Sequence, residues 1–355
     1  MAKPRILYVL RIFPQVSQTY VKYEIEALRD DYDIHVITQT ESRWPYGKFV
    51  DYETIREPDK ILAAANAFKP HVLHSHWLHQ APLVAGLAQQ TNTPFTLRAH
   101  SFDILLDKTD EVITENGIQR SPLVSRAVNA MNSNLCAGVL TFPFTMEILL
   151  KAGVRPVKLF ECFPVVNYDL FHDESPNGQA VMNVGACTPK KNMDDFLKLA
   201  ELVPQRSFHL YPIGYESERI AELNKTQGNP ITIEPIIEPE QMPAAYKKCQ
   251  WLVYTADFEI NQVGWPIAVA EAMASGVGVC VPRIRDDMQE YVGDAGILYD
   301  NIEELPAIIS KPVPEEMRQA GFKQAQKSDI NRHKILLSRA WDRAYRFRMN
   351  FGIPD

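Results

Sequence analysis

The sequence predicts an α/β protein made of two doubly wound, Rossmann-like domains that face a central cleft. The chain has 355 residues, which is too long for one ordinary core and suits two domains of about 150 to 180 residues. Short, nearly continuous apolar runs such as residues 6–10 are typical of strands buried on both faces of a parallel sheet. The alternation of strand and helix also starts twice, at residue 6 and again near residue 181.

The first half predicts a series of parallel crossover units, because each apolar strand is followed by a segment with apolar residues at helical spacing. Tyr20, Tyr23, Ile25 and Leu28, for example, are spaced along one face of a predicted helix. We expect strands at residues 6–10, 34–38, 71–76, 95–100, 137–142 and 157–163, and helices near 20–28, 58–68, 81–90 and 145–153.

The second half repeats this rhythm after the polar, turn-rich segment 172–180, which predicts a linker. We therefore place one domain at residues 1–172 and the other at 173–332. A last helix at 333–355 carries an apolar stripe that must be buried somewhere. In the second half we expect strands at residues 181–185, 208–214, 231–236, 251–256, 278–282 and 295–300, and helices near 193–203, 216–223 and 268–276, with the segment 244–249 left unassigned.

Composition excludes several classes of protein. Apolar residues make up 46% and charged residues 23%, as in ordinary globular proteins. The net charge of −7 argues against a general nucleic-acid binder, which needs a basic field. The five cysteines are dispersed and never form a Cys-x-x-Cys pair, so neither a disulfide framework nor a zinc knuckle is indicated. With no signal peptide or membrane-length apolar run, we expect a soluble, cytoplasmic protein.

Residues just after the strands are the candidates for chemistry, because ligands of open parallel sheets bind beyond the carboxyl ends of the strands. Gly185 ends the strand at 181–185, and Lys191 follows six positions later. That spacing is compatible with an ammonium beside a phosphate. The plainer interpretation is a solvent-exposed lysine at the start of a helix.

A second candidate segment follows the strand at 251–256. Pro266 suits the first turn of a helix, and Gly264 permits close approach of the backbone, so this helix is predicted to direct its positive end into the cleft. Glu271 lies within the helix. A carboxylate there can accept hydrogen bonds from two vicinal hydroxyls, as a ribose offers, or it is simply a solvated charge.

The stretch GWPIAVAEAMASGVGVCV (264–281), followed by EYVGDAGILYD (290–300), resembles the C-terminal motif of the family 4 retaining glycosyltransferases, part of the glycosyl transferases group 1. That family usually has a Glu-Gly-Phe-Gly segment leading into Glu-Ala-Met-Ala-x-Gly. Further segments resemble the family in the same order: FPQVSQTYVKYEIEAL, HVLHSHWLH, PFTLRAHSFDI, FPVVNYDLFH and VGACTPKKN. The resemblance extends over nearly the whole chain and implies the GT-B fold, with a C-terminal helix that crosses back onto the first domain.

The resemblance also implies roles for matching positions. Lys191 is implied to contact the donor diphosphate and to act in catalysis, and Glu271 to bind the donor ribose. His100 is implied to lie by the transferred sugar, with Asp103 nearby in the acceptor domain, and both are candidate catalytic residues. The implied donor site consists of Gly185, Lys191, Gly264, Trp265, Pro266, Ile267 and Glu271.

Two positions depart from the family pattern. The first glutamate of the motif falls on Val263, and the arginine that usually follows the loop glycine falls on Ala186. Losing a charged phosphate contact removes transition-state stabilisation of a few kcal/mol. We expect Arg283 and Arg285, in the loop after the strand at 278–282, to replace the arginine, and Glu259 to replace the carboxylate.

Other features leave alternatives open. His71, His74, His76, His79 and His100 suggest zinc, but no acidic ligand lies at a convincing spacing, so packing or sugar hydrogen bonding is the preferred interpretation. Trp77 and Trp265 either stack on sugar rings or fill the core. The last helix either straps the domains together or contacts anionic lipid weakly through a basic face with interleaved aromatic residues. Its residues are Arg339, Trp341, Arg343, Tyr345, Arg346, Phe347 and Arg348.

The sequence thus predicts a metal-independent, retaining hexosyl-type glycosyltransferase. We expect no cofactor other than a nucleoside-diphosphate sugar as co-substrate, with a glycan, lipid-linked or small-molecule hydroxyl acceptor. The protein is expected in the cytoplasm or at the inner face of the membrane. One alternative is a catalytically degenerate relative that acts as a scaffold for an active transferase. The other is an epimerase or phosphorylase on the same architecture, although neither the paired acid and base nor a pyridoxal-phosphate lysine context is evident.

Overall fold

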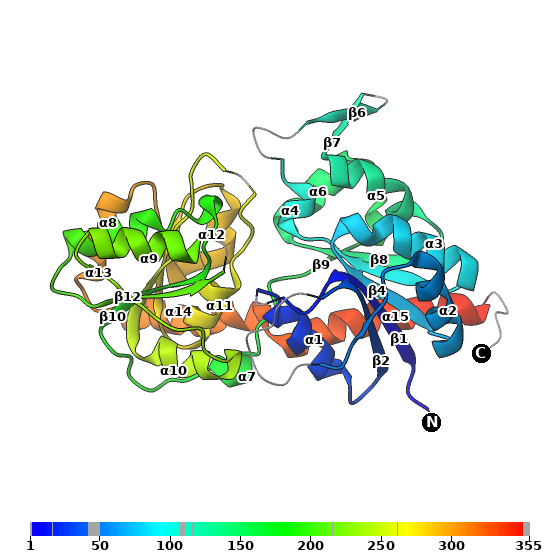
Figure 1. Cartoon of the computed structure of the whole chain (residues 1–355), viewed down its shortest axis with the longest axis horizontal. Coiled ribbons are helices and arrows are strands. Elements are labelled where there is room, and N and C mark those ends of the chain that lie inside the picture. Colours follow the sequence, from blue (N-terminus) through cyan, green and yellow to red (C-terminus); the bar gives the residue numbers. More distant parts are fainter. Residues whose placement is uncertain are drawn as a thin grey trace. The chain divides into compact units, whose positions relative to one another are not determined.

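The computed structural model describes residues 2–15, 17–41, 50–106, 111–115, 117–214, 216–260 and 262–350, with side chains described as far as residue 345. The described residues form two compact units (Figure 1). The first contains residues up to Phe163 together with the chain from Ile330, and the second contains Pro164–Asp329. The linker expected at 172–180 therefore lies inside the second unit, which begins at Pro164.

A parallel sheet with the strand order β3-β2-β1-β4-β5-β8-β9 forms the centre of the first unit. Residues 6–10 of β1 are fully buried, as their apolar run predicted. The strand order reverses between β1 and β4, which makes the carboxyl end of β4 a topological switch point. The strands are β1 (Arg5–Ile12), β2 (Asp33–Thr40), β3 (Glu53–Thr54), β4 (Val72–His76), β5 (Phe95–Arg98), β8 (Cys136–Thr141) and β9 (Leu159–Glu161).

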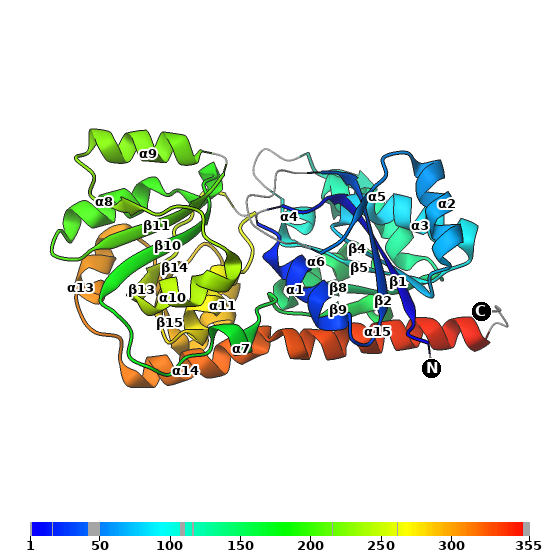
Figure 2. The ribbon, with the colours of Figure 1, turned by 60° about the horizontal axis from the view of Figure 1, so that its bottom comes forward.

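Helices cover both faces of this sheet, and the long last helix is one of them (Figure 2). Leu337, Ala340, Trp341 and Ala344 form the buried stripe of that helix, which packs on α1, β4, β5 and β8. A short antiparallel hairpin of β6 (Ile113–Glu115) and β7 (Ile118–Arg120) was not predicted from the sequence. The helices are α1 (Thr19–Leu28), α2 (Pro58–Phe68), α3 (Ala81–Thr91), α4 (Ser101–Ile104), α5 (Pro122–Asn132), α6 (Pro143–Lys151) and α15 (Ile330–Asn350).

A second parallel sheet, ordered β12-β11-β10-β13-β14-β15, forms the centre of the second unit. Its strands are β10 (Ala180–Ala186), β11 (Phe208–Ile213), β12 (Thr232–Ile233), β13 (Cys249–Val253), β14 (Gly278–Pro282) and β15 (Gly296–Tyr299). Its helices are α7 (Tyr168–Phe171), α8 (Asp194–Leu202), α9 (Ser217–Thr226), α10 (Met242–Lys247), α11 (Ile267–Ala274), α12 (Asp287–Val292), α13 (Leu305–Ile309) and α14 (Glu315–Ala325).

Each unit thus has the predicted α/β class with a parallel sheet, and the expected strands appear in the expected order. Helix α14 was not predicted from the sequence. It packs on α11 with Phe322 and Ala325 buried, although most of its residues are polar. A polar helix with so narrow an apolar stripe gives a weak periodic signal.

Candidate functional site

Lys191 lies where the sequence predicted, in a short 3₁₀ turn (Pro189–Lys191) just beyond the carboxyl end of β10. Gly185 near the end of that strand has φ +140°, and a Cβ built on it would lie 3.1 Å from the Lys191 ammonium. The glycine therefore leaves space directly beside the positive charge. Burial lowers the pKa of Lys191 to about 8.

The Lys191 backbone and ammonium are both held in place. Thr255 donates a hydrogen bond from Oγ1 to the Lys191 carbonyl at 2.7 Å, and Asn183 donates to the same Thr255 oxygen at 3.0 Å. The ammonium lies 4.5 Å from the centroid of the Tyr254 ring. Within the described part of the chain no carboxylate lies within ion-pair distance of it. This arrangement can receive an anion.

Helix α11 begins at Ile267, directly after Pro266. The Pro266 carbonyl accepts a hydrogen bond from the Tyr291 hydroxyl at 2.6 Å, which fixes the entry to the helix. Trp265 is only 4% exposed and stacks on Tyr291 with ring centroids 4.9 Å apart. Of the two roles considered for the Trp265 side chain, filling the core is therefore the one that its position allows.

Glu271 lies on α11 with only 9% of the residue exposed. Its Oε2 accepts a hydrogen bond from the Tyr246 hydroxyl at 2.8 Å. Burial raises the pKa of Glu271 to about 7, although this hydrogen bond opposes the shift. Glu271 is therefore a buried carboxyl group that changes charge near neutral pH.

The two arginines expected to compensate for Ala186 are already engaged with acidic side chains. Arg285 binds Asp287 through two hydrogen bonds of 2.7 and 3.1 Å and donates a third, of 2.6 Å, to the Val263 carbonyl. Arg283 is an exposed residue whose Nε lies 3.2 Å from Asp300 Oδ1. The contacts of Arg285 fix the backbone just before Gly264, which is a supporting role rather than an open anion contact.

The positions that depart from the family pattern differ in their surroundings. Val263 is 2% exposed, so a hydrophobic side chain is buried where the family carries a carboxylate. Ala186 is partly exposed at the end of β10. Glu259 lies in an exposed loop, where its backbone N–H donates to Asp257 Oδ1 at 2.8 Å.

In the first unit, His100 and Asp103 form the start of the short helix α4. Asp103 is fully buried, and its Oδ2 accepts a hydrogen bond from the His100 backbone N–H at 2.9 Å. Burial raises the pKa of Asp103 to about 7. Because its side chain is enclosed and bound to this backbone group, Asp103 can position His100 but has no exposed surface with which to touch a substrate.

Sequence reasoning missed Glu24, which lies on α1 and meets the histidines of β4. Its Oε1 lies 3.0 Å from His76 Nε2 and 3.5 Å from His74 Nε2, and it accepts a hydrogen bond of 3.0 Å from the Tyr8 hydroxyl. All four of these side chains are fully buried. A carboxylate on a neighbouring helix gives no sequence signal, because its distance from β4 depends on how α1 packs.

Two further buried residues complete this cluster. Glu24 Oε2 lies 2.5 Å from His333 Nε2 of α15 and 3.9 Å from Arg98 Nη1. Although burial by itself raises the pKa of Glu24, the contacts with His76 and His333 hold it well below its usual range. Burial lowers the pKa of His76 and of His333 to about 4. The cluster thus places an ionised carboxylate and a guanidinium beside the neutral imidazoles of His76 and His333.

Glu24, His74 and His76 also have the spacing of a metal site, with ligand atoms all within 4.8 Å of one another. The acidic ligand that seemed to be missing from the sequence is therefore present. However, Arg98 already balances the charge of Glu24, and a divalent ion would leave excess positive charge in a site without solvent. The contacts favour a hydrogen-bonded cluster.

The remaining candidates lie apart from these groups. His71 Nδ1 accepts a hydrogen bond of 2.8 Å from the Arg5 backbone N–H, which is a packing role.

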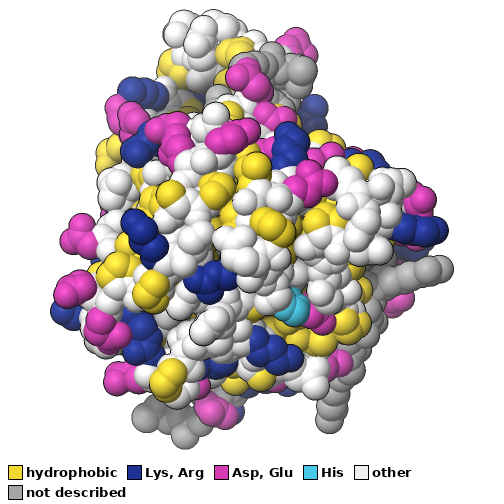
Figure 3. Space-filling model, turned by 90° about the vertical axis from the view of Figure 1, so that its left-hand side faces the viewer, with side chains coloured by type: hydrophobic (Ala, Val, Ile, Leu, Met, Phe, Trp, Pro, Cys, Tyr) yellow, Lys and Arg dark blue, Asp and Glu magenta, His cyan; other side chains and the backbone are white. Residues whose placement is uncertain are grey.

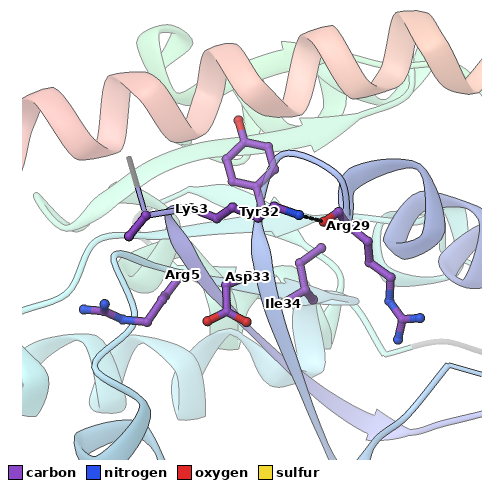
Figure 4. A pocket seen from close by; sticks show the side chains of 7 residues that line it. Lys3, Arg5, Arg29, Tyr32, Asp33 and Ile34 are labelled. Carbon is purple, nitrogen blue, oxygen red and sulfur yellow. Dashed lines mark hydrogen bonds between the residues drawn. The ribbon is translucent and has the colours of Figure 1, made fainter.

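A hollow of about 580 Å³ lies at the amino ends of β1 and β2, which is the opposite edge of the sheet from His100. There Lys3 donates a hydrogen bond to the Arg29 carbonyl (Figure 4).

On α15, Arg339 is exposed and Arg343 donates to the Val157 carbonyl, while the side chains of Arg346, Phe347 and Arg348 lie outside the described residues. On the face drawn in Figure 3, basic and acidic side chains are interspersed. Within the described residues, no helix is both long and apolar enough to span a bilayer.

Comparison with known proteins identifies the class of the second unit. Residues 178–311 match the model of the family described as glycosyl transferases group 1. This segment contains Lys191, Glu271 and the entry to α11. A search among curated proteins found no match.

Solved structures resemble the whole chain. HepE from Anabaena in complex with UDP is 15% identical with a TM-score of 0.75, and the match covers 95% of this chain and 99% of HepE. Sucrose-phosphate synthase from Thermosynechococcus elongatus is 14% identical with a TM-score of 0.72, covering 97% of this chain and 99% of the synthase. At these identities the likeness shows the fold, which is GT-B.

Proposed function

We propose that this protein is a glycosyltransferase that moves a sugar from a nucleoside-diphosphate sugar to a hydroxyl acceptor with retention of anomeric configuration. The observation that carries the proposal is the Lys191 ammonium beside Gly185, half-buried and without a carboxylate in ion-pair range among the described residues. A group 1 glycosyltransferase match across the same segment supports it. HepE has been solved with UDP and with UDP-glucose, which makes a uridine nucleotide the first donor to test.

In the proposed reaction the bond between the anomeric carbon and the diphosphate oxygen breaks as a bond to the acceptor oxygen forms. The acceptor hydroxyl loses its proton to the leaving diphosphate. Negative charge develops on that diphosphate, and Lys191 and the amino end of α11 stabilise it. In this proposal the positive charge comes from the protein, so chelating divalent ions leaves the rate unchanged.

The acceptor is a glycan, a lipid-linked sugar or a small molecule with a free hydroxyl, bound by the first unit. We place the protein in the cytoplasm or weakly at the inner face of the membrane, where exposed Arg339 on α15 can contact anionic lipid. Co-sedimentation with vesicles that contain phosphatidylglycerol, compared with neutral vesicles, measures that contact. Equal recovery with both kinds of vesicle contradicts it.

A thermal-shift and calorimetric screen against UDP, GDP, ADP and their sugars tests the proposal. A ligand that binds only the folded protein raises its melting temperature. We expect one diphosphate to raise it in the wild type and in K198A, but not in K191A. Lys198 is a suitable control because it is an exposed lysine of α8 that pairs with Asp195 at 2.9 Å.

Val263 and Ala186 favour one other candidate, a degenerate relative that acts as a scaffold for an active transferase. The buried Val263 side chain cannot supply the carboxylate of the family pattern. Absence of binding across all three nucleotides in the same screen would support the scaffold and contradict transfer.

A further inference from the structure

A continuous line of side chains links buried Glu24 to the partly exposed His100. Glu24 Oε1 lies 3.0 Å from His76 Nε2, and His76 Nδ1 lies 3.2 Å from His100 Nε2. Glu24 and His76 are fully buried, whereas His100 reaches the surface at the carboxyl end of the sheet. The line therefore runs from the inside of the first unit to the edge at which ligands of parallel sheets bind.

The donors and acceptors along this line follow from the chemistry of Glu24. An ionised carboxylate only accepts hydrogen bonds, so His76 must carry its proton on Nε2. Neutral His76 then has Nδ1 as its acceptor, and His100 must donate to it from Nε2. The remaining ring nitrogen of His100, Nδ1, is left unprotonated, so it is the atom that can accept from the Asp103 backbone N–H in the capping box at the start of α4.

The orientation of the His100 ring is restrained from several sides. The ring stacks on Trp77 with centroids 4.8 Å apart and lies 28° from the plane of His76, to which it is hydrogen-bonded, while Asp103 accepts from its backbone N–H. Trp77 itself has φ +66°, a strained conformation for a residue with a large side chain. Such strain persists where the surroundings fix a residue, and it is often found at functional sites.

We infer that Glu24 and His76 are positioning residues that hold His100 in the Nε2–H tautomer and fix its ring at the carboxyl edge of the first sheet, beside which we place the transferred sugar. This inference rests on the proposed function for the identity of the ligand. The tautomer itself does not depend on any ligand.

The chain offers a matched pair of variants. His74 and His76 both lie on β4, both are fully buried and both face Glu24, but only His76 contacts His100. H76F removes the link, H76Q retains a donor and an acceptor in its place, and H74F serves as the control. The first readout is the ¹⁵N spectrum of histidine-labelled protein, with the His100 signals assigned by their loss in H100N.

We expect a pyrrole-like Nε2 and a pyridine-like Nδ1 for His100 in the wild type, H74F and H76Q, and a measurably larger share of the Nδ1–H tautomer in H76F. If transfer is established, H76F lowers kcat by about 10- to 100-fold with little change in the donor KM, while H76Q and H74F stay within about two- to threefold of the wild type. Equal effects of H76F and H74F on the tautomer or on kcat overturn the inference. So does one equivalent of zinc in the purified protein, which would make Glu24 and both histidines metal ligands.

The two readouts separate the inference from the proposed function. Failure of the tautomer prediction in a protein that binds nucleotide removes the role of Glu24 and His76 alone. A protein with the expected tautomer that binds no nucleotide instead contradicts the proposed function.

Discussion

The carboxyl edges of the two sheets differ in whether their charged side chains have partners of opposite charge. In the first unit Glu24 is enclosed by Tyr8, His76, His333 and Arg98, so its charge is already matched. In the second unit the ammonium of Lys191 has no carboxylate near it among the described residues, and buried Glu271 has a tyrosine rather than a cation as its hydrogen-bond partner there. The charge at the first edge is matched by its own side chains, whereas at the second edge no described carboxylate matches the Lys191 ammonium.

This difference appears in the direction of the pKa shifts. The pKa of Glu24 is held below its usual range because its partners stabilise the carboxylate. Burial lowers the pKa of Lys191 to about 8 and raises that of Glu271 to about 7, so both of these shifts disfavour the charged form. Perturbed groups of the second kind are typical of binding sites.

The largest effect is expected on stability, from Glu24→Ala. The substitution leaves Arg98 buried without its countercharge, so we expect the free energy of unfolding to fall by about 3–5 kcal/mol. Chemical denaturation measures it. Glu26→Ala on the same helix, where an exposed glutamate pairs with Lys22 at 3.9 Å, is the control and should change stability by less than about 0.5 kcal/mol. Similar losses in both variants would show that the first edge is not charge-matched as described.

Lys191→Ala is expected to lower kcat/KM by about 10²–10³-fold, as for the loss of one group that stabilises a developing anion. Arg285 does not replace the charge that is removed from the second edge, because it is bound to Asp287. Steady-state transfer rates measure it, with K198A as the matched control. A rate for K191A within about threefold of the wild type would remove Lys191 from the mechanism.

Glu271→Gln should raise the stability of the protein at alkaline pH and lower its affinity for the donor. The folded-state pKa of about 7 exceeds the unfolded value, so the wild type loses stability as pH rises from about 4.5 through 7. The substituted amide carries no charge, and E271Q should be more stable by about 1–3 kcal/mol at pH 8, with the difference vanishing near pH 4.5. Donor affinity should fall at the same time. Equal stability at pH 8 would mean that the carboxylate is not disfavoured.

The smallest expected effect is on the pH dependence of donor binding. Glu271 loses its charge as pH falls through about 7, and Lys191 loses its charge as pH rises through about 8. Affinity for the diphosphate sugar should therefore be greatest between these values, with a fall of several-fold one unit outside either limit. Lys191→Arg keeps its charge and should remove the alkaline fall alone. A profile that is flat from pH 6 to 9 contradicts both assignments.

Much of the fold could be predicted from the sequence, because buried strands such as residues 6–10 and 278–282 are continuous apolar runs. Lys191 and Glu271 could be found because each follows a strand or a proline that signals a helix start. Glu24 and His333 could not, since they reach the histidines of β4 from helices whose packing leaves no local pattern. The pairing of Arg285 with Asp287 could have been predicted, because the acid lies only two residues from the arginine. The prediction considered Arg285 only as a phosphate contact.

The central claim is that Lys191 binds the diphosphate of the donor. The most direct test is to titrate the nucleotide into the protein at pH 8 in a calorimeter, in two buffers of different ionisation enthalpy, and so to measure the protons taken up on binding. Binding of an anion raises the pKa of the nearby ammonium, so the wild type should take up about half a proton per nucleotide, given a starting pKa of about 8. Lys191→Arg, which is charged throughout, should bind with almost no uptake. Equal proton uptake in the two proteins, or undiminished binding by Lys191→Ala, would contradict the account.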